Sequence, residues 1–116
     1  MQRALAIWQG HAGFAQRIGV CLNNLGRICE ERGQTEQGIA LHRQALALRQ
    51  RSLGEHEDTA FSLGNLGVAL AAAGYWAEAA ARLREAVALY GKLGRGDSAE
   101  AQSYRSNLAI CEQTIS

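Results

Sequence analysis

The feature that most constrains the fold of this chain is an internal repeat of about forty residues. Residues 24–48 read NLGRICEERGQTEQGIALHRQALAL, and residues 65–89 read NLGVALAAAGYWAEAAARLREAVAL. The two segments share an Asn-Leu-Gly start, a central glycine (Gly33 and Gly74) and an apolar run at the end. Self-similarity at a fixed period of this length indicates a stacked array of supersecondary units.

The composition indicates that these units are helical. The chain has no proline, and residues that favour helices, such as alanine, leucine, glutamine and arginine, dominate it. A length of 116 residues with 47 % hydrophobic residues allows one small domain with a core of limited size. We therefore predict an all-α chain that forms a single domain over residues 1–116.

Breaks in the apolar periodicity divide the chain into helices. We expect helices at 14–32, 35–51, 59–73, 76–93 and 97–113, and a shorter one at 1–9 that is separated from the next by a glycine-rich link at 10–13. In the 14–32 helix, apolar residues at spacings of three and four form one face. The predicted units are a half-repeat at 1–10, repeats at 14–52 and 58–93, and a half-repeat at 97–115.

The helix ends carry recognisable signals. Gly33 is expected to end its helix with a positive φ, as is its counterpart in the second unit. Asp58 or Thr59 is expected to cap the helix that follows it, and Asp97 with Glu100 resembles a capping box.

Two glycines fall inside predicted helices at matching places. Gly26 and Gly67 would each cost about 1 kcal/mol relative to alanine in an isolated helix. Their recurrence predicts that a partner helix approaches closely there, with Ala45 and Ala86 as the small residues opposite.

These residues resemble the tetratricopeptide repeat. Leu63-x-x-Leu66-Gly67-x-x-Leu70, Gly74-Tyr75 and Ala79-x-x-x-Leu83 follow its pattern, whereas Gly38 and His42 depart from it in the first unit. The longer repeat and the link at 53–60 are similar to the kinesin-light-chain variety found in bacterial regulators. The resemblance implies a right-handed α-solenoid of antiparallel helix pairs, with two full repeats flanked by two half-repeats.

The resemblance also implies a protein- or peptide-binding scaffold with a concave groove. Asn24, Asn65 and Asn107 would project into this groove and hold the backbone of an extended peptide, since an amide both donates and accepts. The alternative is that these asparagines bond only to water or to a neighbouring helix. The other residues expected in the peptide site are a basic one and three apolar ones: Arg27, Phe61, Val68 and Ile110.

The terminal half-repeats give a second functional hypothesis. Leu5, Ile7 and Trp8 at one end and Leu108 at the other belong to helices without a partner, so they would expose apolar faces. These residues would then pair chains into a homo-oligomer. The alternative is that the chain is a piece of a longer array whose further repeats cover both ends.

Charge and motif content disfavour other classes of function. The net charge of +1 gives no field for nucleic acid or an anionic membrane, and no apolar run reaches transmembrane length. Three cysteines without metal-type spacing fit a reducing compartment, and we expect a cytoplasmic protein with these cysteines in its core. The three histidines show no triad spacing, and the EHED segment at 55–58 is expected to be a solvated loop and not a metal site. We therefore expect no enzyme activity and no cofactor.

Overall fold

The computed structural model of the chain is built from helices. It describes residues 2–116, with side chains from residue 13 onwards, and no strand occurs in this range. The elements are α1 (Gln2–Glu31), α2 (Thr35–Leu53), α3 (Glu57–Ala72), α4 (Trp76–Lys92) and α5 (Ala99–Ile115). The predicted all-α class is confirmed.

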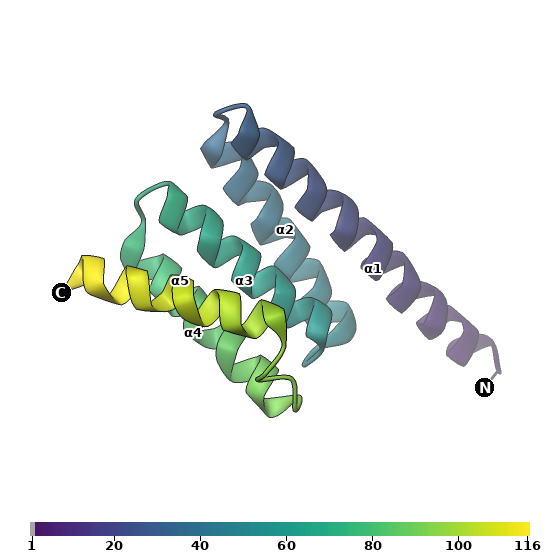
Figure 1. Cartoon of the computed structure of the whole chain (residues 1–116). Coiled ribbons are helices and arrows are strands. Elements are labelled where there is room, and N and C mark those ends of the chain that lie inside the picture. Colours follow the sequence, from purple (N-terminus) through teal and green to yellow (C-terminus); the bar gives the residue numbers. More distant parts are fainter. Residues whose placement is uncertain (1) are drawn as a thin grey trace.

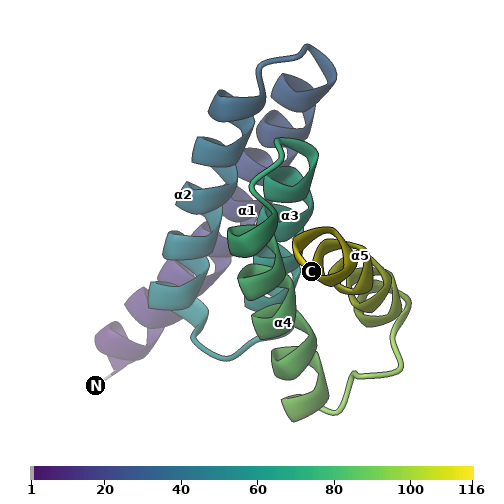
Figure 2. The same ribbon diagram turned by 90° about the vertical axis from the view of Figure 1, so that its left-hand side faces the viewer.

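The helices form two antiparallel pairs and a fifth helix that packs on the second pair (Figure 1). α1 packs on α2 and α3 packs on α4, while α2 with α3 and α4 with α5 make the contacts between units. Figure 2, turned by 90°, shows α3 and α4 between the first pair of helices and α5. α1, α3 and α5 are thus the first helices of successive units, as the repeat predicts.

The core is thickest in the second pair. The side chains of Leu66, Leu70 and Leu83 are each 1 % exposed or less. Ala79 and Ala86 fill the space between the two helices. Burial of large aliphatic side chains is the main source of stability in such a unit.

The two mid-helix glycines mark close helix approaches, as predicted, but the neighbours differ from those expected. A Cβ on Gly67 would lie 2.6 Å from Cγ of Leu83, and a Cβ on Gly26 would lie 2.8 Å from Nε2 of His42. Ala45 and Ala86, the small residues expected opposite, are fully buried, but they do not supply the nearest atoms. The long side chain one turn earlier on the second helix covers each glycine instead.

The expected break at residues 10–13 is absent. α1 is one helix of 30 residues, so the prediction of a separate helix at 1–9 was wrong. Glycine lowers helix stability but keeps its backbone N–H, and without proline the hydrogen-bond ladder continues through Gly10 and Gly13. Figure 1 shows the first turns of α1 projecting past the end of α2. The side chains of Leu5, Ile7 and Trp8 lie outside the described residues.

The glycine helix ends are confirmed, and the predicted N-terminal caps are not. Gly33 and its counterpart Gly74 have φ of 77° and 88°. His56 caps α3, because its Nδ1 accepts from the backbone N–H of Asp58, and Ser98 caps α5 through the N–H of Ala101. The cap expected at Asp58 or Thr59 was therefore two or three residues too late, and the cap expected at Asp97 was one residue too early.

The cysteines do not all lie in the core. Cys111 is buried, but Cys29 is half-buried and Cys21 is exposed, so the expectation of three core cysteines was wrong for Cys21. The reason is that Cys21 lies on the face of α1 turned away from α2, which no other helix of the described chain covers.

Candidate binding groove

A groove of about 540 Å³ runs across the first helices of the three successive units, α1, α3 and α5. It brings together six of the seven residues that the resemblance assigned to peptide binding: Asn24, Arg27, Phe61, Asn65, Val68 and Asn107. Ile110 does not line this groove; it lies further along α5, where its side chain is 55 % exposed.

The three asparagines differ in how much hydrogen-bonding capacity they keep. Oδ1 of Asn65 accepts from the Tyr104 hydroxyl at 3.0 Å, which leaves its NH₂ group as a donor. Nδ2 of Asn107 donates to the carbonyl of Ser103 in the same helix at 2.9 Å, which leaves its Oδ1 as an acceptor. Asn24 is exposed and forms no hydrogen bond within the described side chains. The groove therefore offers both donors and acceptors to an extended backbone.

Tyr104 is a wall of the groove that sequence reasoning missed. Its single hydroxyl proton is shared between Oδ1 of Asn65 at 3.0 Å and the carbonyl of Phe61 at 3.3 Å, and its ring stacks on Tyr90 with centroids 6.1 Å apart. Burial raises the pKa of Tyr104 well above its usual value of about 10, so the hydroxyl stays a donor into strongly alkaline solution. The sequence feature that could have pointed to Tyr104 is Gly64, because a Cβ on this glycine would overlap the Tyr104 ring.

His42 and its partners close the groove on the α2 side. Nδ1 of His42 lies 3.0 Å from Oδ1 of Asn23, and Nε2 lies 2.8 Å from Oε1 of Glu30. The His42 side chain is buried and fills the place that Leu83 takes in the second pair. His42, one of the two departures from the repeat pattern, thus fills a packing position, and its polar partners on α1 were not predicted.

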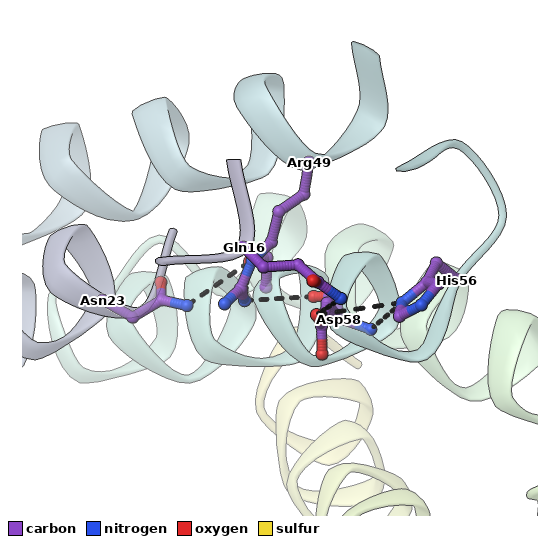
Figure 3. Close-up of polar contacts among 6 residues, drawn as sticks. Gln16, Asn23, Arg49, His56 and Asp58 are labelled. Atoms are coloured by element: carbon purple, nitrogen blue, oxygen red, sulfur yellow. Dashed lines mark hydrogen bonds and ion pairs between the residues drawn. The ribbon is translucent and has the colours of Figure 1, made fainter. Parts of the chain in front are cut away.

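Behind this wall, a buried arginine joins the first pair of helices to the second. Arg49 is 2 % exposed, and its Nη1 donates to Oγ of Ser62 at 2.8 Å and to the carbonyl of Asp58 at 3.2 Å. Asn23 donates to the same Oγ at 3.4 Å, and Gln16 donates to the Asp58 carboxylate. Figure 3 shows Arg49 reaching from α2 into this cluster.

Burial of Arg49 lowers its pKa, leaves one of its donors without a partner in the described part of the chain and requires a glycine beside it. Desolvation lowers the pKa of Arg49, an effect that the Asp58 carboxylate opposes. Its Nε has no partner among the described side chains, and Gly19 makes room for the guanidinium because a Cβ there would overlap it. At the next junction Tyr90 takes the equivalent place, packed on Tyr104.

An acidic hollow of about 350 Å³ lies next to the groove and shares Phe61 and Glu100 with it. Glu57 and Asp58 line this hollow from the start of α3, and Arg95 forms an ion pair with Glu57 at 2.7 Å. The groove itself carries the negative charge of Glu100 where α5 begins, and on α1 it carries both Arg27 and Glu30.

Among the described side chains, no hydroxyl of the groove lining forms a hydrogen bond to a histidine or a carboxylate. Among the residues whose side chains are described, no group of three potential metal ligands comes together. Glu55 of the EHED segment pairs with Lys92 at 2.6 Å, and His56 caps α3. None of the helices from residue 2 onwards is long and apolar enough to cross a membrane.

Comparison with known families accounts for this architecture. The model of the tetratricopeptide repeat matches residues 19–92, which run from the middle of α1 to the end of α4. A comparison with curated proteins finds no match. Tetratricopeptide repeats are non-catalytic modules that commonly mediate protein–protein interaction. With most of its length matched, the chain belongs to the tetratricopeptide repeat family.

Proposed function

We propose that the chain is a binding scaffold that holds an extended peptide segment of a protein partner in the groove across α1, α3 and α5. The observation that carries this proposal is the convergence of the predicted asparagines with apolar side chains in one open groove. The NH₂ group of Asn65 and the amide of Asn24 bind the peptide backbone, while Phe61 and Val68 receive an apolar side chain. Arg27 and Glu100 contact the polar flanks, and Ile110 extends the apolar surface beyond the groove.

The wider setting is part of the same proposal. The repeat length and the 53–60 link support the long-repeat variety of kinesin light chains. The near-neutral charge supports a protein partner and not nucleic acid or a membrane surface. The excess of arginine over lysine supports a bacterial protein, and the three unpaired cysteines support a cytoplasmic one. The match to a non-catalytic repeat supports a role without cofactor or enzyme activity.

The test is a selection of short random peptides on the wild-type chain, followed by affinity measurements with the selected peptide. Asn65→Ala should weaken binding about tenfold, because it removes the amide hydrogen bonds to the peptide backbone. The fold should tolerate this change, since the Tyr104 hydroxyl keeps the Phe61 carbonyl as an acceptor. Gln37→Ala on the exposed side of α2 is the matched control and should bind as wild type does. Equal affinity of wild type and Asn65→Ala would refute the groove as the site.

A second candidate function is association of chains through their terminal segments. Exposed apolar side chains near the end of α5 favour it: Ile110 is 55 % exposed and Ile115 is 52 % exposed, with Leu108 half-buried beside them. In this reading α5 of one chain contacts the first turns of α1 of another. Leu108→Glu should then lower the mass in solution, and an unchanged mass would count against this mode.

A further inference from the structure

An apolar stripe on α1 faces away from the rest of the molecule. It consists of Phe14, Ile18, Cys21, Leu25 and Ile28, and we call it the α1 stripe. Phe14, Leu25 and Ile28 are 61 %, 49 % and 41 % exposed, Cys21 is exposed, and Ile18 is half-buried. The alternating spacing of four and three residues is the heptad pattern with which one helix packs on another. The stripe is therefore a helix-packing face that no helix of the described chain covers.

The second repeat shows what such a face receives. The residues of α3 equivalent to Ile18, Cys21 and Leu25 are Thr59, Ser62 and Leu66, and all three are buried. On α3 this side packs against α2, where Arg49 bonds to Ser62. The same side of α1 thus has the geometry to receive a helix. The heptad spacing indicates that this helix would run nearly parallel or antiparallel to α1.

We propose that the occupant is the same stripe of a second copy of the chain, packed antiparallel about a two-fold axis. In an antiparallel heptad pair, each a position faces a d position of the partner helix. This register places Cys21 opposite Leu25 and Ile18 opposite Ile28 of the second copy. Phe14 then lies against the aliphatic stem of Arg32, which packs its guanidinium near the ring. A two-fold contact of this kind is closed, so it yields a dimer.

The charged residues beside the stripe are complementary in this antiparallel register and favour it over a parallel one. Arg17, Asn24 and Glu31 form the row next to the stripe; all three are exposed, and neither charge forms an ion pair within the described chain. The antiparallel pairing sets Arg17 opposite Glu31 of the second copy at both ends. It also sets Asn24 opposite its own copy at the axis, where two amides bond to each other. A parallel pairing would place Arg17 beside Leu22 and leave both charges unmatched.

This dimer does not depend on the proposed peptide groove. The stripe and the groove lie on different sides of α1. Only Asn24 borders both, and its bonds to its own copy use one N–H and the oxygen, which leaves the second N–H for a peptide. The groove test uses Asn65 on α3, which the dimer leaves uncovered, so the two proposals fail separately.

The first experiment is light scattering on the full chain over a concentration series. Wild type should approach twice the chain mass of 12.5 kDa. Leu25→Glu should weaken the dimer by at least about tenfold, because it places two charges in the apolar contact. Val20→Glu is the matched control: Val20 lies on the same helix and is 51 % exposed, but it is outside the stripe. Circular dichroism should show that both variants keep the wild-type helix content, since neither side chain is buried.

Charge reversal then tests the register. Arg17→Glu and Glu31→Arg should each weaken the dimer, because each places like charges opposite one another twice. A mixture of these two variants should recover the dimer mass, since every pair in the mixed dimer is complementary, and so should the double variant. The proposal would be overturned if wild type kept the mass of a single chain up to about 1 mM, because its association free energy would then be weaker than about 4 kcal/mol. So would a dimer that persists in Leu25→Glu, a dimer lost in Leu108→Glu, or a mixture that stays monomeric.

Discussion

Replacing Arg49 with alanine measures how much the buried polar cluster stabilises the junction between the two repeats. The side chain is 2 % exposed and donates to Ser62 at 2.8 Å and to the Asp58 carbonyl at 3.2 Å. Hydrogen bonds from a charged donor contribute about 1.5–3 kcal/mol each. Loss of most of the side-chain volume adds a cavity cost on the order of 2 kcal/mol.

Two terms oppose this loss. The variant no longer buries a guanidinium whose pKa is lowered by desolvation, and it removes the unpartnered Nε. Because the variant no longer desolvates a charge, it regains on the order of 2–3 kcal/mol of folding free energy. We therefore expect Arg49→Ala to lower the free energy of unfolding by about 3 kcal/mol.

Urea denaturation with matched variants tests this magnitude. Arg51→Ala, an exposed arginine of the same helix, should change the free energy of unfolding by about 0.5 kcal/mol or less. Arg49→Met keeps most of the volume without the charge, so it should recover about half of the loss. If Arg49→Ala and Arg51→Ala had the same denaturation midpoint, the cluster would contribute nothing to the junction.

The remaining predictions concern a helix approach and a tyrosine. Gly67→Ala should destabilise the chain by about 1–2 kcal/mol, because its Cβ would lie 2.6 Å from Cγ of Leu83 and the core must shift. Gly13→Ala meets nothing within 4 Å and should gain up to about 1 kcal/mol of helix stability, so equal melting temperatures for the two variants would contradict this account. Burial raises the pKa of Tyr90 to about 12, so folding favours the neutral phenol. That contribution is fully present below the unfolded pKa of about 10 and is lost as the pH rises through 12. Tyr90→Phe should reduce this alkaline loss of stability, and the share of Tyr104, whose pKa burial also raises, should remain. An unchanged pH profile would show that Tyr90 does not contribute to the loss.

The helix pairs and most of the groove follow from sequence because their signals are local or periodic. Gly33 ends α1 through a backbone conformation that glycine adopts without strain, and this depends little on the rest of the fold. The repeat itself places Asn24, Asn65 and Phe61 on equivalent faces of successive first helices. Stacking of the units then brings these faces into one groove.

The buried cluster could not be predicted because it depends on pairs that lie far apart in sequence. His42 and Arg49 stand where the second repeat has Leu83 and Tyr90, so each looks like an isolated departure from the pattern. Gly19 and Gly26 supply the space for them, but a glycine in sequence does not say which side chain uses its space.

The misplaced break in α1 has a different cause. Gly10 and Gly13 each weaken a helix by about 1 kcal/mol, and this is too little to end one when the flanking residues favour helix. The exposure of the α1 stripe could not be predicted either, since its apolar spacing is the same as that of a face covered by another helix. Whether Leu25 is covered depends on what packs against α1, and the 14–32 segment does not contain that information.

The most direct test of the central claim is to locate the bound peptide by NMR. Titration of the selected peptide into isotope-labelled chain should shift the side-chain amide signals of Asn24 and Asn65 and the backbone signals around Phe61 and Tyr104. Signals from the exposed side of α2, such as that of Gln37, should stay in place. Shifts confined to α2 and α4, with the asparagine signals unmoved, would contradict recognition in the groove.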